Sequence, residues 1–182
     1  NPNVKKLIAS NPAVLGAYEL REVKMSYGQE KLLLKYFGEP PMPEKIPGRK
    51  PEPRYPIFDI MDRDGEQAGY DLFHAKDPTV IVSENFSIHT GKHTGDYVEL
   101  ATPKGLLPFR IVAIASEYAN TFGTIYMSRK TYRNVFEDNL VSGFAVKLKH
   151  GFDPVQIRKE LDLLLSKQYK LTILLNSDIR SQ

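Results

Sequence analysis

The sequence of 182 residues contains no cysteine, so the chain forms neither disulfide bonds nor thiolate-metal sites. This absence does not identify a redox compartment, because proteins of oxidising compartments can also lack cysteine. No stretch approaches the roughly 18 apolar residues of a transmembrane helix, and no basic start with an apolar middle marks a signal peptide. Because the sequence also lacks an initiator Met and stops at SDIRSQ, we expect it to be an excised piece whose natural flanks are missing.

Motifs of the common enzyme and nucleotide-binding classes are missing as well. A hydrolase places its nucleophile on a sharp turn with a base in reach, and the sequence contains neither G-x-S-x-G nor HExxH. The phosphate-binding patterns GxxxxGK[ST] and GxGxxG are absent too, and the glycines are scattered through turns. We therefore expect no enzymatic activity, no catalytic residue and no cofactor.

Two short patterns contain residue types that bind metals. His89 and His93 are four residues apart, a spacing that suits two ligands on one helical face, but Gly91 lies between them and no nearby carboxylate completes a set. The DRDGE run at residues 62–66 contains part of a calcium loop, yet its later ligands are not at the required spacing. Both patterns are better explained as polar loops, so we expect no metal site. A metal-dependent enzyme using the two histidines is kept as a third hypothesis.

What the sequence does contain is the composition of a globular protein, with 41% hydrophobic and 26% charged residues. The net charge of +3 comes from charges of both signs that are interspersed along the chain, so we expect no nucleic-acid partner. Ten tyrosines and nine phenylalanines could line a cavity, although core packing is the commoner fate of aromatic residues. This aromatic content motivates an alternative function, a soluble ligand-binding or sensory module.

The first third of the chain alternates between regular and irregular segments. Helical spacing of apolar residues predicts a short helix at residues 4–10, and a period of two predicts a β-hairpin over 20–36 with its turn at Gly28-Gln29. Seven prolines lie between Pro40 and Pro56, so that segment is a loop or extended arm, either a surface insertion or a preformed surface for a partner. A strand over 55–61 and a turn over 62–65 follow.

The middle of the chain predicts several short strands with capped helices between them. Ser83 caps a helix after a strand at 80–82, and Gly91 ends that helix. Gly95 and Asp96 then form a turn into a strand over 97–102, where Val98 and Leu100 share one face. Further strands follow at 109–115 and 123–127, and Ser128 caps the next helix. We interpret the strands over 97–102 and 109–115, with a turn at 102–105, as meander strands of a small barrel, and Gly91, Gly95 and Asp96 as structural turn residues.

The last third reads as strand, helix, strand. Phe144, Val146 and Leu148 alternate with polar residues, and Asp153-Pro154 begins a helix with an apolar stripe that includes Leu161. Gln156 completes the spacing of a capping box in that helix. A second strand is predicted over 171–175, as in ferredoxin-like α+β layers, and a final helix near residues 176–177.

The order of these elements resembles the extracytoplasmic domain of the MacB/FtsX/LolE-like permeases of ABC transporters. TVIVSENFSIHTGKHTGDYVEL is similar to the family's strand, short helix and G-x-x-x-GD turn, with Gly91, Gly95 and Asp96 in place. FRIVAIASEY is similar to the family's F-x-V-x-G-I strand, except that Ala113 replaces a glycine, and GTIYMSRKTYRNVF and the DP helix start continue the series. The similarity covers about Val4 to Arg180, loosely before Tyr55, and departs at the proline-rich segment, so no binding residue is carried over.

The resemblance implies an α+β fold in which a discontinuous ferredoxin-like layer carries an inserted small β-rich subdomain. The layer would comprise residues 1–60 and 138–182, and the insertion residues 61–137. The resemblance further implies a non-enzymatic domain between the first two membrane helices of a four-helix permease, with residues 4–10 and the segment after Asn176 as stalks. The domain would face the periplasm or the cell exterior at the cell (inner) membrane.

The partners that the resemblance implies are a cytoplasmic ATPase subunit, reached through the membrane helices, and a second permease in a dimer. A periplasmic partner protein or a lipoprotein could engage the domain itself. ATP hydrolysis would then drive extracytoplasmic movement, as in export or lipoprotein release.

Overall fold

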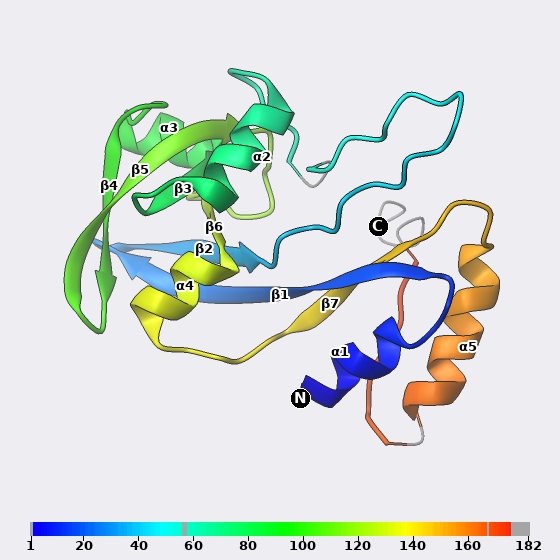
Figure 1. Ribbon diagram of the computed structural model, residues 1–182. Coiled ribbons are helices and arrows are strands. Elements are labelled where there is room, and N and C mark those ends of the chain that lie inside the picture. The colour runs from blue at the N-terminus through cyan, green and yellow to red at the C-terminus, as the bar shows by residue number, and fades with distance from the viewer. Residues whose placement is uncertain (1, 56–57, 167, 176–182) are drawn as a thin grey trace. The chain divides into compact units, whose positions relative to one another are not determined.

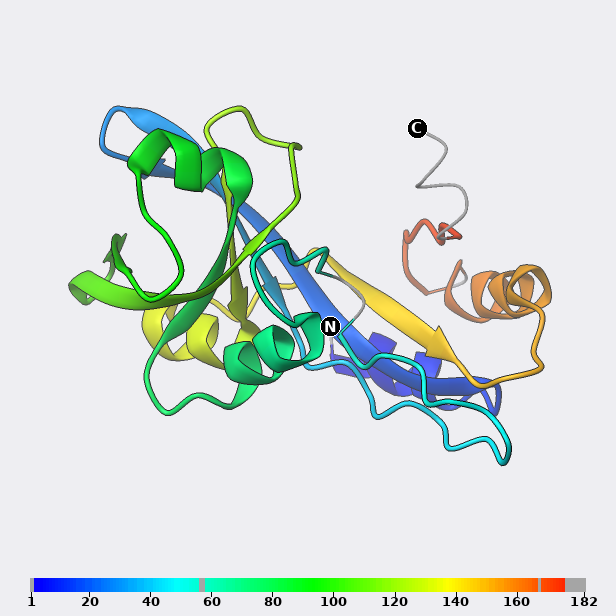
Figure 2. The same ribbon diagram turned by 90° about the horizontal axis from the view of Figure 1, so that it is seen from above.

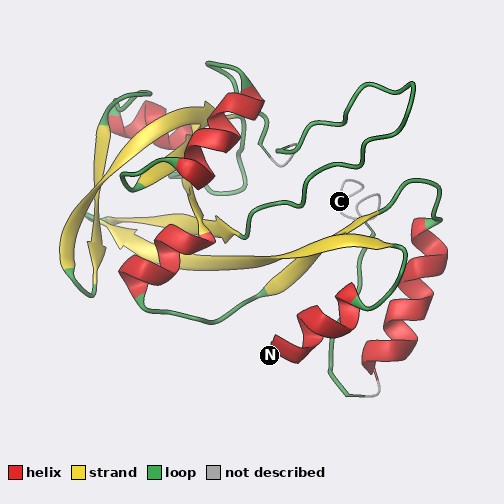
Figure 3. Ribbon diagram, in the orientation of Figure 1, coloured by secondary structure: helices red, strands yellow, loops and turns green. Residues whose placement is uncertain are grey.

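In the computed structural model, which describes residues 2–55, 58–166 and 168–175, the described residues form five helices and seven strands (Figures 1 and 3). The helices are α1 (Pro2–Ala9), α2 (Gly65–His74), α3 (Glu84–Thr90), α4 (Arg129–Phe136) and α5 (Pro154–Ser166). The strands are β1 (Val14–Tyr27), β2 (Glu30–Phe37), β3 (Thr79–Ser83), β4 (Tyr97–Thr102), β5 (Gly105–Ala115), β6 (Thr124–Ser128) and β7 (Gly143–Leu148). The residues divide into two compact units. Unit 1 contains residues 1–17, 41–52 and 144–182, and unit 2 contains residues 18–40 and 53–143.

The strands form one mixed sheet in the order β4-β5-β3-β6-β2-β1-β7. Antiparallel pairs are β1 with β2, β4 with β5 and β3 with β6, whereas β3 with β5 and β2 with β6 are parallel. Parallel neighbours need a crossover connection, which here contains a helix. The mixed α/β architecture confirms the predicted α+β class. The turn predicted at 102–105 joins β4 and β5 as an antiparallel pair. The meander of a small barrel that was predicted from these strands is wrong, because the other neighbour of β5 is the parallel strand β3, within one seven-stranded sheet.

Unit 2 buries both faces of its sheet. On one face, Phe86 of α3 and Tyr132 and Val135 of α4 pack with strand residues such as Phe109 and Ile125. On the other face, the core is completed by α2 through Ala68 and Leu72, which pack with alternate strand residues. Residues of β3 and β6 are therefore buried on both sides, and every residue of these two strands is buried, in keeping with their continuous apolar sequence.

Unit 1 buries apolar side chains in two small clusters. Val4 and Ile8 of α1 pack with Val14 and with Leu165 of α5, and Ala13 packs with Ile157 and Leu161. In the sheet β7 lies beside β1 (Figures 1 and 2). Just beyond the ends of these strands in unit 1, the amide of Lys149 donates to the carbonyl of Ala13. The α5 stripe is thus the main apolar wall of unit 1.

Local signals in the sequence are confirmed at several places. The hairpin turns at Gly28, with Tyr27 opposite Glu30, and the predicted first helix is α1. The Ser83 and Ser128 hydroxyls accept from the amides of Phe86 and Thr131, as N-caps do. The capping box at α5 is only half formed, because the Asp153 carboxylate accepts from the Val155 amide while Gln156 donates to Glu160.

The predicted strand over 55–61 is wrong, and α2 was not predicted. Of the described residues there, only Ile60 makes a β-bridge, to Ala115. The amide of Tyr55 donates to the side chain of Glu66 in α2, whereas the amide of Met61 donates to the carbonyl of Ile114 in β5. The start of this stretch is therefore held by a helix, and only its end lies along a strand. The predicted turn over 62–65 leads directly into α2, because the Asp64 carboxylate accepts from the Gln67 amide and caps that helix.

The predicted strand over 171–175 is also wrong. Ile173 packs against both clusters of unit 1, while Leu171 is exposed, and the segment forms no strand. Alternating hydrophobicity shows that one face is buried but does not provide a free strand edge for pairing. The final helix expected near residues 176–177 lies outside the described residues. The predicted subdomain bounds at 60 and 138 stay a prediction.

Candidate functional site

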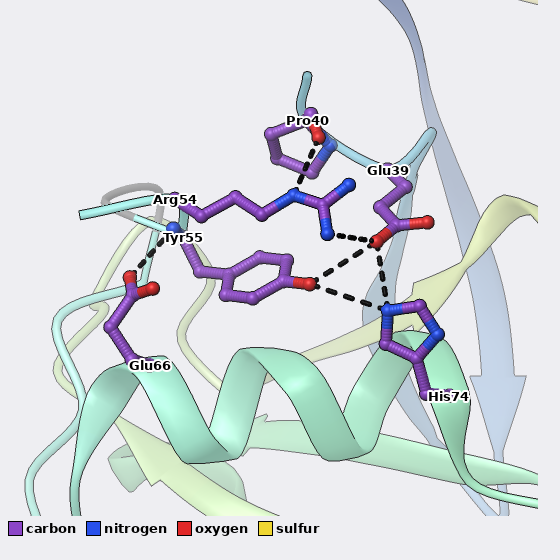
Figure 4. Close-up of polar contacts among 6 residues, drawn as sticks. All are labelled: Glu39, Pro40, Arg54, Tyr55, Glu66 and His74. Atoms are coloured by element: carbon purple, nitrogen blue, oxygen red, sulfur yellow. Dashed lines mark hydrogen bonds and ion pairs between the residues drawn. The ribbon is translucent and has the colours of Figure 1, made fainter. Parts of the chain in front are cut away.

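The proline-rich arm, which we define as residues 40–55, is the longest segment between two elements that has neither helix nor strand (Figure 3). As predicted from its prolines, it is a loop. Its two ends meet at a polar group in unit 2 that we call the anchor cluster (Figure 4). The anchor cluster comprises Glu39, Arg54, Tyr55, Glu66 and His74. Because loops on rigid scaffolds carry function disproportionately, we treat the arm and its anchor as the candidate site.

One carboxylate oxygen organises the anchor cluster. Oε1 of Glu39, which follows β2, lies 2.8 Å from Nη1 of Arg54 and 2.9 Å from Nε2 of His74. The same oxygen accepts a hydrogen bond from the Tyr55 hydroxyl at 3.2 Å, and that hydroxyl lies 3.5 Å from Nε2 of His74 (Figure 4). Three donors from the arm and from α2 therefore converge on the residue that precedes the arm.

The second end of the arm is fixed by backbone contacts and by close packing. Arg54 donates from Nε to the carbonyl of Pro40 at 3.0 Å, and the Tyr55 amide donates to Glu66 Oε1 at 2.8 Å. The ring of Tyr55 stacks on Phe73 at 5.5 Å between centroids. A Cβ at Gly69 would lie 2.3 Å from Cγ of Tyr55, so the ring reaches α2 only because position 69 has no side chain.

The electrostatics of the anchor cluster keep the Tyr55 hydroxyl protonated, so that this group can hold the arm through a hydrogen bond. Burial, outweighing the opposing charge of Arg54, raises the pKa of Tyr55 to about 12. At neutral pH its hydroxyl is therefore protonated and acts as a hydrogen-bond donor to Glu39. A general base or nucleophile would need a pKa nearer to the working pH. The arrangement can close a loop and resist its opening.

The predicted turn residues lie where α3 leads into β4. Gly91 ends α3 with a left-handed φ of 66°, and Gly95 has a φ of 96°. The carboxylate of Asp96 accepts from the amide of His93 at 2.8 Å, and the carbonyl of Asp96 accepts from the amide of Ile111 at 2.8 Å. Both glycines occupy backbone conformations that residues with a Cβ rarely adopt.

The predicted metal-binding candidates have structural contacts. His89 stacks on Phe122 at 5.3 Å, and its Nδ1 lies 2.8 Å from the carbonyl of Asn85. Asp62 accepts from Thr94 and from the amide of Ile114, and Asp64 caps α2. Among the residues that the structure describes, no three His, Asp or Glu side chains are grouped to hold a metal ion.

The aromatic side chains that motivated a ligand-binding module lie mostly in the cores. The largest fully buried side chains include Tyr36, Phe86 and Phe109. Tyr70, Tyr97, Tyr118 and Phe152 are exposed.

Among the described residues, no helix has both the length and the hydrophobicity that a bilayer crossing requires.

Comparison with known proteins places the fold. No protein-family model matches the sequence, and neither does any curated protein. Among solved structures, the periplasmic region of MacB from Actinobacillus actinomycetemcomitans matches with a TM-score of 0.59 at 14% identity, over 100% of this chain and 80% of that one. The chain shares its fold with that region. The extracellular domain of the noncanonic ABC-type transporter YknZ from Gram-positive bacteria also matches, with a TM-score of 0.55 at 13% identity, over 93% of this chain and 84% of that one.

These matches confirm, at the level of the fold, the resemblance that was predicted from the order of elements. The anchor cluster itself was not predicted. Its members are separated by up to 35 positions in the sequence, between Glu39 and His74. The one local signal was Gly69 within the unrecognised helix α2, which marks a close approach that nothing else in the sequence identifies.

Proposed function

We propose that the chain is a non-enzymatic extracytoplasmic domain of an ABC transporter permease, facing the periplasm or the cell exterior at the cell (inner) membrane. In this role it passes movement that is driven by a cytoplasmic ATPase to a substrate or partner, as in export or lipoprotein release. Its partners are that ATPase, reached through membrane helices of the permease, a second permease in a dimer, and a periplasmic protein or lipoprotein.

The observation that carries this proposal is the fold match over the whole chain. The MacB region and the YknZ domain are both extracytoplasmic by their descriptions, and the match leaves no part of this chain uncovered in the MacB comparison. A fold alone does not determine function, so a site must supply the rest of the argument. The raised pKa of Tyr55 and the pairing of Glu39 give the candidate site a positioning role, which fits a binding or mechanical domain.

The packing within unit 1 supports attachment at both ends. α1 and α5 share one cluster, in which Val4 and Ile8 of α1 contact the same apolar group as Leu165 of α5. A domain inserted between two membrane helices needs its first and last elements in one unit. The cluster supplies that arrangement, with the inserted β-rich subdomain proposed for residues 61–137.

Topology of the full-length protein tests the proposal. The natural sequence of the chain has no cysteine, so a single Gln29→Cys substitution in the exposed hairpin turn creates the only reactive thiol in this segment. We expect a membrane-impermeant maleimide to label this thiol in intact cells, and the labelled permease to co-purify with an ATPase subunit. The full gene should encode a long apolar run before Asn1 and another after Gln182.

The matched control is Leu32→Cys in β2, where the side chain is 0% exposed and the thiol stays protected while the domain is folded. Labelling of the Gln29→Cys protein only after permeabilisation would place the domain in the cytoplasm. Absence of flanking apolar runs in the gene would also contradict a permease.

A further inference from the structure

Unit 1 contains a cavity of about 280 Å³ between the proline-rich arm, the end of β7 and the turn before α5. The volume lies just below the range for drug-sized ligand sites, roughly 300–1,000 Å³, so the cavity suits a small ligand. The arm supplies one wall with Glu44, Ile46, Arg49, Lys50 and Glu52. The site therefore exists because of the segment in which the sequence departs from the family that it resembles.

The cavity is lined by more cations than anions. Four cationic side chains, Arg49, Lys50, Lys147 and Lys149, face two carboxylates. Both carboxylates are engaged. Glu52 Oε2 lies 3.4 Å from Lys147 Nζ. Glu44 Oε2 accepts from the amide of His150 at 2.5 Å.

Two of the cations are left for a ligand. Lys149 donates to the carbonyl of Pro12 at 2.6 Å, and Lys147 is paired with Glu52. Within residues 2–55, 58–166 and 168–175, no carboxylate forms an ion pair with Arg49 or Lys50. Arg49 Nη1 lies 3.1 Å from Nε2 of His150, and because a guanidinium only donates, the ring nitrogen is the acceptor in this hydrogen bond. The cavity thus carries uncompensated positive charge.

Apart from His150 and Gly151, the rest of the lining is apolar. The apolar residues are Leu15, Ile46, Leu148, Phe152 and Pro154, of which Phe152 is 46% exposed. A ligand that satisfies both parts of the lining combines an anionic group with a short apolar chain. A purely apolar ligand would leave the charges uncompensated, and a purely ionic one would not use the apolar part.

The arm is preformed against unit 1. A Cβ at Gly16 of β1 would lie 2.9 Å from Cβ of Pro41, so the arm approaches the strand because position 16 is glycine. The prolines of the arm restrict its backbone before any ligand arrives, which lowers the conformational entropy lost on binding. A cavity wall of this kind is suited to selective binding of a small molecule.

We propose that this cavity binds a small amphipathic anion, a carboxylate or phosphate ester with a short alkyl chain, with its anionic group between Arg49 and Lys50. The binding is independent of the proposed transporter function, because it depends only on residues of unit 1. A failed topology experiment would leave it standing, and the converse also holds.

The test is a titration of the intact 182-residue protein with sodium octanoate, followed by ¹H–¹⁵N NMR. We expect amide shifts at residues 49–50 and 147–152, and we expect the double variant Arg49→Gln/Lys50→Gln to weaken binding by about tenfold or more, the effect of losing charged hydrogen bonds. Lys159→Gln, on the exposed face of α5, is the matched control and should bind octanoate as the natural protein does. Circular dichroism checks that each variant is folded.

Two further probes separate the outcomes. Octylamine has the same chain with the opposite charge, and binding as tight as that of octanoate would overturn the electrostatic part of the proposal. Inorganic phosphate lacks the chain, and equal affinity for it would overturn the apolar part. Shifts confined to residues outside the cavity, or no shift at millimolar octanoate, would overturn the site itself.

Discussion

The two units differ in how they bury apolar residues. Unit 2 encloses a sheet between helices, and side chains such as Phe86, Phe109 and Ile111 are 0% exposed. Unit 1 has two small clusters, and on the same helix α5 Leu161 is 4% exposed while Leu163 is 69% exposed. A core of buried strands resists local opening, whereas a helix with one buried stripe does not, so unit 2 is expected to be the more stable part.

The two units also carry different candidate sites. The anchor cluster belongs to unit 2 and the cavity to unit 1, and the proline-rich arm, whose ends the anchor cluster holds, supplies one wall of the cavity. Ligand-binding segments are drawn from the less stable parts of a protein, and the proposed cavity lies in unit 1, which is expected to be the less stable unit.

The largest effect is expected from Phe109→Ala in β5. The ring is fully buried in the main core of unit 2, and truncating a buried Phe costs about 3–5 kcal/mol in lost transfer free energy and residual cavity. We expect this loss in the free energy of unfolding by urea denaturation, with reduced hydrogen-exchange protection in β3, β5 and β6. Leu106→Ala, 66% exposed on the same strand, is the control and should stay within about 0.5 kcal/mol. A loss below 1 kcal/mol for Phe109→Ala would contradict the expectation that the core of unit 2 is the more stable part of the protein.

A smaller loss is expected from Leu161→Ala in α5. The side chain is 4% exposed and packs with Ala13 and Ile157, and such truncations cost about 2–5 kcal/mol, with less where the surroundings can collapse. We expect the lower half of this range and reduced amide protection confined to α1 and α5. Leu163→Ala is the control on the same helix. Equal loss of protection in β3 and β6 would show that the units unfold together.

Sequence patterns predicted the elements that depend on local residues. Helix caps and turn glycines depend only on neighbouring residues. The structure has the predicted caps at Ser83 and Ser128 and the predicted turn or helix end at Gly28 and Gly91. The continuous apolar runs predicted strands but not their partners, because a strand buried on both faces shows no period that fixes its neighbours. The parallel pairing of β3 with β5 therefore could not be predicted from the sequence.

The candidate site depends on contacts between distant residues, and these could not be predicted from local patterns. Glu39 and His74 meet only because α2 lies next to the end of β2, and α2 itself was missed because DRDG was interpreted as a turn alone. The strand predicted over 55–61 failed for the same reason, since the Tyr55 amide pairs with a side chain of that helix. The cavity of unit 1 likewise needs the arm and the turn after β7 in contact.

The close approach of Tyr55 to α2 gives a third prediction, for Gly69→Ala. The new Cβ would overlap the buried ring at 2.3 Å, and overpacking of this kind costs about 1–3 kcal/mol. The loss should appear in unit 2 and spare the protection of α5. Gly65→Ala is the matched control in the same helix, because its Cβ would meet nothing nearer than 3.8 Å and an alanine favours helix. If Gly69→Ala were neutral, the ring would not be held as described.

Tyr55→Phe removes the hydroxyl that donates to Glu39 and leaves the ring. One such hydrogen bond contributes about 0.5–1.5 kcal/mol, so we expect a loss of that size at neutral pH. Burial raises the pKa of Tyr55 from 10.0 to about 12, so the unfolded chain ionises first and the natural protein loses stability as the pH rises from 10 to 12. The variant should lose less over this window, as measured by urea denaturation at pH 9 and 11.5. A loss as steep as that of the natural protein would contradict the burial of this hydroxyl.

The smallest effect is expected on the surface of unit 2, at the pair of Asp77 and Arg110. Two hydrogen bonds of 2.7 and 3.0 Å from Arg110 lower the pKa of Asp77 below its ordinary 3.8, although both side chains are partly exposed. The pair therefore stabilises the fold above pH 3.8, and this contribution is lost as the pH falls through the lowered pKa. Asp77→Asn should cost at most about 1 kcal/mol at pH 7, and the difference from the natural protein should shrink as the pH falls below 3.8 and through the lowered pKa. Asp162→Asn on α5 is the control in unit 1. Because an exposed ion pair contributes so much less than a buried ring, a loss from Asp77→Asn comparable to that from Phe109→Ala would mean that unit 2 depends on its surface pairs rather than on its core.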